Sequence, residues 1–573
     1  MIKKKNIPII EGFKKHLFLL LILSIVVSIL EAASLSSIGG LVYTFLNDID
    51  ILKAKISSYT GIKFITNLGD SEFLNLIIIF IFLLFIVKNL IKLLNSYLEV
   101  SIIKRIQIKN SSALFKKYID LDLLQFTNKK LNEILNDISA ETIRASKFIN
   151  SVVVFIREII LVFILIITLS LANFKVTFFS FLTIIVLLFL YNFVFRNKSK
   201  YFGNKITESQ KLVLKNIIEP FQFFKFLKIL DKKIFFEKKL LSTLREKIKF
   251  EIKQSMVLKY PPSYFEISFL VVLLVVSYFF FKSESDFNQV LPFLSIFVLF
   301  SLRLANSFIN IYNSINNLKF YKNSLKNVEN KINSLNVIKK KKVMPIDFNE
   351  IELKNLSFRY PKSNIYIFKN LNIKIKKNKI LGLFGPSGCG KSTLLDIILG
   401  LLKPTKGQIL LNKKIFNFYK FHIYEFFSYI PQKSYLINDT IQNNINIGND
   451  SNFLNKNKLR DSLKKSEIYK FVKSLPKGVK TICEDGGKNF SGGQAQRIAL
   501  ARALYINHKI LIMDESTASL DKTTENKIFN NLRRDKSRTI IFVSHNKKLK
   551  KFCDYSIDFP AIKRISKKKT DEN

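Results

Sequence analysis

Long apolar segments alternate with charged stretches through the first 310 residues of the chain. Because a membrane core about 30 Å thick needs about 20 apolar residues in a helix, these segments predict membrane-spanning helices. The second, fifth and sixth segments are short for a span, so the count of six depends on the even alternation of the loops between them. The predicted spans are Leu17–Leu46, Leu76–Leu94, Val152–Ala172, Val176–Phe195, Ile267–Phe281 and Val290–Leu304.

The loops between these spans differ in charge. Lys and Arg outnumber Asp and Glu in the stretches 97–148 and 197–262, whereas the stretches 47–73 and 282–287 are slightly acidic. Since basic loops stay in the cytoplasm, the two basic stretches and the basic N-terminus are predicted to lie there, together with everything after the sixth span. The first apolar run is too long for a cleavable signal peptide. We therefore expect a multi-pass protein of the cell (inner) membrane.

The two basic stretches carry apolar residues at helical spacing, for example Ile134 and Ile138 in the first and Leu230 and Ile234 in the second. This pattern predicts helices that continue the membrane helices into the cytosol. The middle of each stretch is where a second domain could be contacted: Leu121–Phe126 and Ile218–Leu230.

Seven charged residues lie in or beside the apolar segments. A charge at the middle of a bilayer costs about 2.5–3.5 kcal/mol on insertion scales, so each needs a physical reason. Glu31 is the deepest and stands beside Ala32, Ala33 and Ser34, which favours a helix face turned to the bundle interior. For Glu31 both a cavity-facing role and an internal ion pair stay open. The others lie nearer the predicted inner face, where long side chains can reach the headgroups: Lys88, Lys92, Arg157, Glu158, Glu266 and Arg303.

Past the lysine run Lys339–Lys342 the pattern changes to short apolar runs of strand length, which predicts a second, α/β domain. Its most specific stretch is Gly385-Pro386-Ser387-Gly388-Cys389-Gly390-Lys391-Ser392-Thr393, which fits G-x-x-x-x-G-K-[ST] between a predicted strand, Ile380–Phe384, and a predicted helix. Glycines there let backbone N–H groups and the helix N-terminus point at nucleotide phosphates. Lys391 would add a positive charge and Ser392 a hydroxyl ligand for Mg²⁺.

Two further apolar runs are predicted strands that end in groups suited to hydrolysis: Ile510–Glu515 ends in two carboxylates, and Thr539–His545 has a histidine at its tip. Ligands of α/β folds bind at the carboxyl ends of strands. Asp514 could hold Mg²⁺ through water, and Glu515 could polarise the attacking water. Tyr360 ends another strand pattern, and taken alone it is more simply explained as a core residue.

The net charge of +48 raises the possibility of a nucleic-acid partner. We expect none, because the charge follows the loop topology and no aromatic and basic residues alternate as a stacking platform would require. Cys389, Cys483 and Cys553 show no paired spacing, which favours reduced cytosolic thiols over a disulfide or a metal site.

The order and spacing of these segments resemble the ABC transporter ATPase. The matching segments are Gly385–Thr393, Gln432, Ser491-Gly492-Gly493-Gln494, Asp514-Glu515, Ser519-Leu520-Asp521 and His545. The resemblance covers about residues 349–558, and the six-span half resembles the exporter type, in which the membrane domain comes first. It implies a helical six-span membrane domain at 1–335, a linker at 336–348, and an α/β P-loop ATPase with a helical subdomain at 349–573.

The resemblance also implies roles for single residues. Tyr360 would stack on adenine, Gln432 would sense Mg²⁺ and the γ-phosphate, Glu515 would be the catalytic base, and His545 would contact the γ-phosphate. Ser491–Gln494 would bind the nucleotide held by a second copy. The chain would then be an ATPase coupled to transport, active as a homodimer with two composite ATP and Mg²⁺ sites.

The membrane half resembles, more loosely, the subgroup that contains lipid-linked oligosaccharide flippases and peptide exporters. Our leading hypothesis is a flippase or exporter for a lipid-linked saccharide or other amphipathic molecule, with Glu31, Lys88 and Arg303 as candidate substrate residues. A peptide or hydrophobic-compound exporter is the alternative, and an ATP-gated channel or regulatory membrane protein is a third possibility. The external stretch 47–73 fits either an interfacial helix touching lipid or an ordinary loop.

Overall fold

The computed structural model describes residues 8–560, apart from 47–48, 51–52, 54–56, 59–65, 173, 175–176, 179–197, 223, 283–286, 335–340, 343–347, 362, 420, 423–425, 449–453 and 485. Contacts divide the chain into two compact units. One unit is Met1–Ile119 with Lys129–Asn336, and the other is Asp120–Asn128 with Val337–Asn573.

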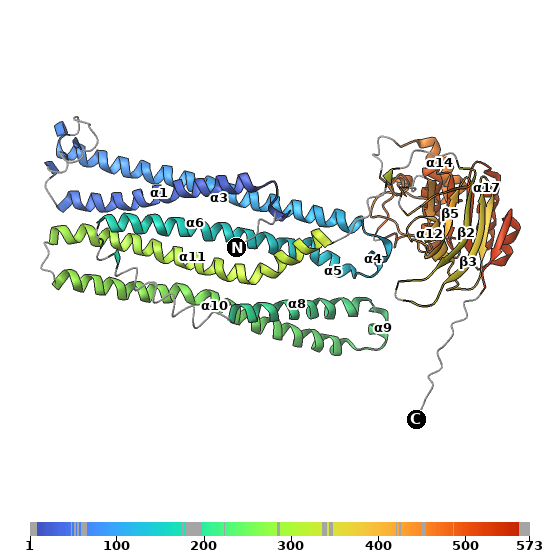
Figure 1. The fold of residues 1–573 in the computed structure, drawn as a ribbon, viewed down its shortest axis with the longest axis horizontal. Helices are drawn as coiled ribbons and strands as arrows, with labels where there is room; N and C mark the ends of the chain where they lie inside the picture. Colours follow the sequence, from blue (N-terminus) through green and yellow to red (C-terminus); the bar gives the residue numbers. More distant parts are fainter. Residues whose placement is uncertain are drawn as a thin grey trace, which may run out of the picture. The chain divides into compact units, whose positions relative to one another are not determined.

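The first unit is built from long helices. Helices α1, α3, α6 and α11 pack side by side, and α8 packs along α10 (Figure 1). The bounds are α1 Lys14–Leu46, α3 Asp70–Ile119, α5 Leu131–Asn136, α6 Thr142–Ala172, α8 Lys198–Gln222, α9 Phe224–Ile229, α10 Lys233–Lys282 and α11 Phe287–Ser334, with a short 3-10 turn, η1, at Pro8–Ile10.

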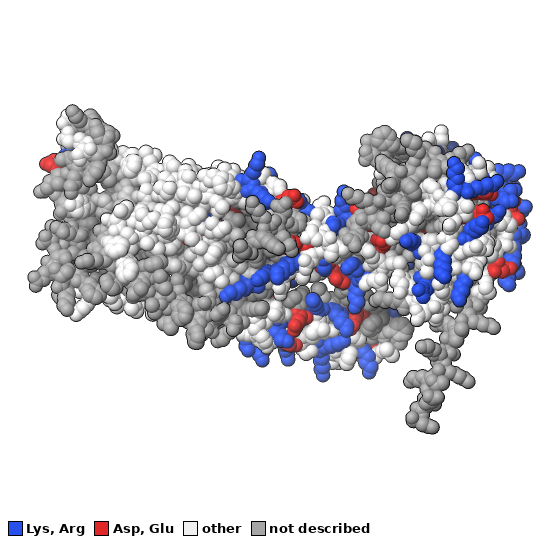
Figure 2. All heavy atoms as spheres, viewed as in Figure 1, with Lys and Arg blue, Asp and Glu red and all other residues white. Residues whose placement is uncertain are grey.

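Four stretches within the described helices are long and apolar enough to cross a membrane: Lys14–Phe45, Asp70–Ile119, Leu131–Leu171 and Leu294–Ser334. The predicted fifth span falls within α10, and the predicted fourth, Val176–Phe195, lies almost wholly outside the described residues. On the face shown in Figure 2, one end of the helical unit presents hardly any charged side chain, and Lys and Arg gather towards the other end.

The helices continue far beyond the predicted spans. At 1.5 Å per residue, the 50 residues of α3 extend about 75 Å, more than twice a membrane core. The basic stretch after the second span is therefore largely a continuation of its helix, as its apolar spacing predicts.

A π-helical turn, η3 at Asp137–Glu141, lies between α5 and α6. Asp137 is buried there, accepts a hydrogen bond from the Tyr118 hydroxyl near the end of α3, and pairs with Lys331 near the end of α11. One carboxylate thus joins three helices close to their ends, and burial together with that carboxylate raises the pKa of Tyr118.

The second unit is organised on a five-stranded parallel sheet of order β11-β4-β10-β9-β8. Every residue of β4, β9 and β10 is buried, which explains why these strands are continuous apolar runs in the sequence. The bounds are β4 Ile380–Phe384, β8 Phe427–Ile430, β9 Ile510–Asp514, β10 Thr539–Ser544 and β11 Tyr555–Asp558.

An antiparallel sheet of order β3-β2-β5-β6 packs with α12 on one core, and α16 and α17 pack on a second core with β9 and β10. Short helices α13 to α15 share a third core with α16 and form a helical subdomain. The bounds are β2 Glu350–Phe358, β3 Phe368–Lys376, β5 Lys406–Leu411, β6 Lys414–Ile415, α12 Lys391–Ile398, α13 Ile441–Ile445, α14 Lys456–Lys465, α15 Tyr469–Ser474, η6 Gly478–Lys480, α16 Gly492–Ile506, α17 Lys522–Arg534 and η7 Lys547–Phe552, with β1 Lys341–Lys342 paired to β7 Phe421–His422.

Helix α4, Leu123–Thr127, belongs to the second unit although its flanking helices belong to the first. Leu123 and Leu124 pack against the first of these cores, and Asp122 accepts a hydrogen bond of 2.7 Å from the Tyr419 hydroxyl. The first of the two stretches expected to contact another domain therefore does so. At the second stretch, α9 presents exposed apolar side chains instead, with Phe226 65 % and Ile229 80 % exposed.

Candidate nucleotide site

The phosphate loop runs from buried β4 into α12. Gly388 and Gly390 have φ of 77° and 95°, a backbone region that only glycine enters at little cost. A Cβ at Gly390 would lie 2.3 Å from Cγ2 of Ile367, so the position also lacks room for a side chain. At Gly388 an added Cβ meets no atom within 4 Å, which leaves this side of the loop open for a ligand.

Lys391 opens α12 and is buried. Its ammonium donates to the carbonyl oxygens of Gly385 and Pro386 at 2.9 and 2.8 Å, and lies 3.8 Å from Oε1 of Glu515. A phosphate would offer this ammonium a charged partner in place of two neutral ones.

Ser392 and Asp514 form an oxygen pair suited to Mg²⁺. The Ser392 hydroxyl donates to Oδ1 of Asp514 at 3.2 Å, and Asp514 is buried at the carboxyl end of β9. Burial raises the pKa of Asp514, and the neighbouring charge of Glu515 acts in the same direction. A hydroxyl and a carboxylate beside a phosphate loop are the ligand types that Mg²⁺ prefers, so the residues present fit the ion.

Three strand ends converge on Glu515. Its carboxylate accepts a hydrogen bond of 2.7 Å from Nε2 of Gln432, after β8, and lies 2.5 Å from Nε2 of His545, after β10. Nδ1 of His545 lies 2.8 Å from the carbonyl oxygen of Gly385, so the ring links the carboxylate to the phosphate loop. Glu515 has φ of 47°, a strained conformation of the kind that gathers at functional sites.

Tyr360 lies beside the last residue of the phosphate loop. Its hydroxyl is 3.2 Å from Oγ1 of Thr393, and its ring packs edge-on against Phe358 at 5.1 Å between centroids. The residue is 38 % exposed, which leaves it accessible to a base.

The segment Ser491–Gln494 caps α16 by itself. The Ser491 side chain accepts from the N–H of Gln494 at 3.3 Å, and the Gln494 side chain accepts from the N–H of Ser491 at 2.9 Å. Gly493 lies close to Ser519, and Asp521 caps α17, where hydrogen bonds from Thr523 and Thr524 lower its pKa. Within the described chain, no hydrogen bond or ion pair joins Ser491–Gln494 to the phosphate loop.

Sequence reasoning missed two residues beside Asp514. Burial and the charge of Asp514 raise the pKa of Asp396 to about 6, and burial with both carboxylates raises the pKa of Tyr429. Asp396 follows Ser392 by one helical turn, so its position on α12 was the available signal.

Replacing Asp396 by Asn is expected to raise the melting temperature of the nucleotide-free protein in EDTA. A carboxyl whose pKa is raised on folding destabilises the fold once it ionises, so the gain should be full at pH 8 and smaller at pH 5. Circular dichroism melts of the detergent-solubilised protein would measure it, with the exposed Asp461→Asn as control. An equal gain at both pH values would contradict this assignment.

The three membrane candidates lie in the helical unit. Glu31 on α1 and Arg303 on α11 form an ion pair of 2.6 Å between Oε1 and Nε, so the ion-pair alternative holds for Glu31. Lys88 on α3 is buried, with its ammonium 4.0 Å from the Phe85 ring centroid.

A P-loop ATPase domain with a helical subdomain, on one chain with a bundle of long apolar helices, defines an exporter-type ABC half-transporter. The second unit has the parts of an ATPase, and in transporters of that class the ATPase drives export across a membrane.

The comparisons with known proteins agree with this class. Residues 368–518 match the family model described as ABC transporter. An export ATP-binding/permease protein of Rickettsia prowazekii is 26% identical over 83% of this chain and 84% of its own length, and the multidrug resistance-like ATP-binding protein MdlA of Buchnera aphidicola is 38% identical over 33% and 32%. A bacterial Atm1-family ABC exporter solved with ATP bound shares the fold, with a TM-score of 0.76, 16% identity, and coverage of 96% of this chain and 94% of that one.

Proposed function

We propose that two copies of the chain form a homodimer that hydrolyses ATP at two composite sites and moves an amphipathic, lipid-linked molecule, most simply a saccharide, out of the cytoplasmic leaflet of the inner membrane. The observation that supports the dimer is that, among the described residues, no hydrogen bond or ion pair joins Ser491–Gln494 to the phosphate loop of the same chain. The hydrogen bonds between Ser491 and Gln494 hold the segment at the start of α16, so it keeps its conformation without contacting a nucleotide bound to its own chain.

The exposed apolar tip of α9 supports a second copy. Phe221, Phe224, Phe226, Ile229 and Leu230 are all at least half exposed at the end of the α8–α10 hairpin. A cluster of large apolar side chains at the cytosolic end of a hairpin marks a contact surface rather than a solvated loop. The partner's ATPase domain is the occupant that fits, because α4, the matching element of the other cytoplasmic stretch, is already packed on an ATPase domain.

At each composite site the chain's own residues would act as follows. Lys391 would leave its two carbonyl partners for the phosphates, and Ser392 and Asp514 would hold Mg²⁺, which neutralises phosphate charge when bound. Glu515 would take the proton of the attacking water, with its carboxylate oriented by Gln432 and His545. Tyr360 would hold the base, and Ser491–Gln494 with Asp521 of each copy would close the other copy's site.

A disulfide test addresses the dimer directly. In a variant whose three cysteines are replaced by Ala, the pair Ser387→Cys and Ser491→Cys should cross-link two polypeptides on oxidation, and more strongly with ATP in a Glu515→Gln background. Non-reducing gels would show a band of twice the chain mass, and Ser491→Cys alone should not give it. A cross-link that stays within one chain, or efficient hydrolysis by a strict monomer, would refute the composite site.

The substrate needs a separate assay in vesicles. A lipid-linked saccharide should stimulate ATP hydrolysis and become exposed to a glycan-cleaving enzyme on the side opposite the ATPase domain, and Glu515→Gln should abolish the exposure. Peptide uptake without saccharide exposure would favour the peptide exporter. Ion current without ATP turnover would favour a channel.

A further inference from the structure

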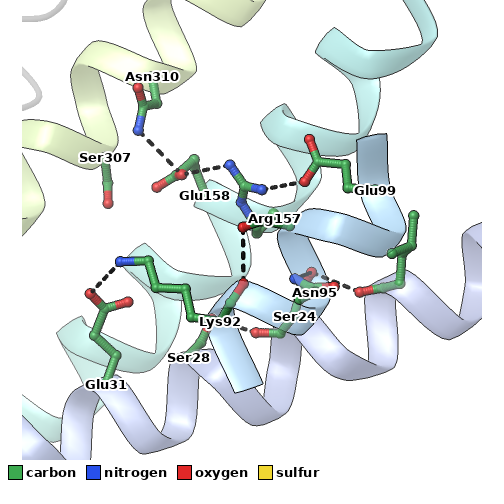
Figure 3. A network of polar contacts seen from close by, with 12 residues as sticks. Ser24, Ser28, Glu31, Lys92, Asn95, Glu99, Arg157, Glu158, Ser307 and Asn310 are labelled. Carbon is green, nitrogen blue, oxygen red and sulfur yellow. Dashed lines mark hydrogen bonds and ion pairs between the residues drawn. The ribbon is translucent and has the colours of Figure 1, made fainter. Parts of the chain in front are cut away.

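Four helices of the first unit share a buried network of charged side chains (Figure 3). At its centre Glu31, on α1, pairs with Arg303, on α11, through two contacts: Oε1 to Nε at 2.6 Å and Oε2 to Nη2 at 3.3 Å. Glu31 also lies 3.9 Å from the ammonium of Lys92, on α3. Three helices therefore meet at one carboxylate that is only 5 % exposed.

Around Arg157, on α6, positive and negative side chains of the network are paired. Glu158 lies 3.4 Å from Arg157 and accepts a hydrogen bond of 3.3 Å from Asn310, and Arg157 also pairs with Glu99. Arg303 reaches Glu158 only at 3.8 Å and donates to the Ser307 hydroxyl at 3.0 Å. Each cation on this side has a close carboxylate.

Lys88 is different. It lies one turn before Lys92 on α3 and is 8 % exposed, and its charge interacts with those of Glu31, Lys92 and Arg303. Its ammonium rests over the Phe85 ring, and among the described residues no carboxylate lies within ion-pair distance of it. Arg303 and Lys92 thus share Glu31, and Lys88, one turn from Lys92, adds a third positive charge without a carboxylate of its own among the described residues. This end of the network therefore has more positive than negative charge.

The depth of this cluster suits a lipid headgroup. Lys88 lies 18 residues after the start of α3, Arg303 16 residues after the start of α11, and Glu31 15 residues before the end of α1. At 1.5 Å per residue, these positions are about 22–27 Å from those helix ends, which is the inner part of a core about 30 Å thick.

We propose that Lys88, Lys92 and Arg303 bind the anionic headgroup of the transported lipid, and that Glu31 fills this site as an internal counter-ion until the headgroup displaces it. The inference rests on the proposed function only in assuming an amphipathic substrate, and it does not depend on a saccharide. A phosphate group offers the guanidinium the same two-point contact that Glu31 now makes, and it also supplies the charge that Lys88 lacks.

If the headgroup displaces Glu31 from the three cations, this carboxylate has a role in transport as well as in the stability of the helix bundle. Three cations gathered at one place without an anion would repel one another, so a resident carboxylate stabilises the free state. The same carboxylate competes with the substrate, and removing its charge should therefore strengthen anion binding.

The test uses the full chain in nanodiscs of phosphatidylcholine to which phosphatidic acid is added. Glu31→Gln should lower the phosphatidic acid fraction that half-stimulates ATP hydrolysis by about tenfold, and Lys88→Gln should raise it by a similar factor. Glu99→Gln is the matched control, because Arg157 is the one cation that the Glu99 carboxylate pairs with among the described residues, and it should leave the value within about twofold of the parent.

The outcomes separate the possibilities. If Glu31→Gln weakens the response as Lys88→Gln does, the pair is only structural and the inference fails. If inorganic phosphate in solution competes with phosphatidic acid at millimolar concentration, the site takes a free anion and the assignment to a lipid headgroup fails.

Native mass spectrometry of the phosphatidic acid that each variant retains makes the same comparison without ATP. A variant that folds but hydrolyses ATP slowly can therefore still be tested for lipid binding. If Glu31→Gln does not fold, Lys88→Gln decides alone, and unchanged lipid retention would overturn the site. If the variants change the response to phosphatidic acid as expected but no lipid-linked saccharide is moved, the headgroup site is supported and the proposed saccharide substrate is refuted.

Discussion

Replacing Glu515 by Gln is expected to lower steady-state ATP hydrolysis by at least about 100-fold, because a positioned general base contributes a factor of this size or more. Gln keeps the shape of the side chain and can still bond Gln432 or His545, so ATP binding should survive. The measurement is phosphate release by the reconstituted full chain, alongside binding of a labelled ATP.

A matched control is Glu352→Gln, which removes a carboxylate of the same domain that pairs with Lys374 on the antiparallel sheet. It should hydrolyse ATP at the parent rate. Full activity of Glu515→Gln would refute the assigned base, and loss of both binding and hydrolysis would show that the carboxylate supports the loop rather than the chemistry.

Replacing Lys391 by Ala is expected to weaken ATP binding by between about 30-fold and 5,000-fold, the range for removing one partner of a buried charged contact. Among the residues Gly385–Thr393 of the phosphate loop, Lys391 alone carries a positive charge, and only neutral hydroxyls and backbone N–H groups would remain without it. Equilibrium binding in the Glu515→Gln background would measure the effect without hydrolysis.

Lys527→Ala, an exposed change on α17, should leave the affinity unchanged. Because Lys391 also holds two carbonyl oxygens of the loop, Lys391→Arg serves as a second variant that keeps the charge while changing its shape. An unchanged affinity in Lys391→Ala would contradict the phosphate-loop assignment.

Sequence reasoning worked best where the signal was local. The strand Ile380–Phe384 has the predicted bounds, and the predicted strands Ile510–Glu515 and Thr539–His545 end one residue earlier, at Asp514 and Ser544. These strands were recognisable because strands buried on both faces are uninterrupted apolar runs. The phosphate loop was recognisable for the same reason, since its glycines, Lys391 and Ser392 are consecutive.

Contacts between distant parts of the chain were beyond sequence reasoning. Glu31 and Arg303 are 272 residues apart, and neither composition nor spacing shows that they pair. Helix α4 packs on the ATPase core, whereas the apolar side chains of α9 are exposed. The sequence could not distinguish the two, because both are short apolar helices between basic stretches. Asp396, on α12, was missed because its environment is set by Asp514, at the end of β9.

The π-helical turn at Asp137–Glu141 has a consequence for how this chain tolerates changes of length. Such a turn accommodates one more residue than an α-helix over the same rise. Deleting one residue there would let regular α-helix form over the same rise and would leave the residues after it facing nearly the same way. A deletion inside the regular part of α6 would instead rotate every later residue by about 100° and turn the apolar face of the helix away from its neighbours, so we expect a change of length to be tolerated at Asp137–Glu141 and not further along α6.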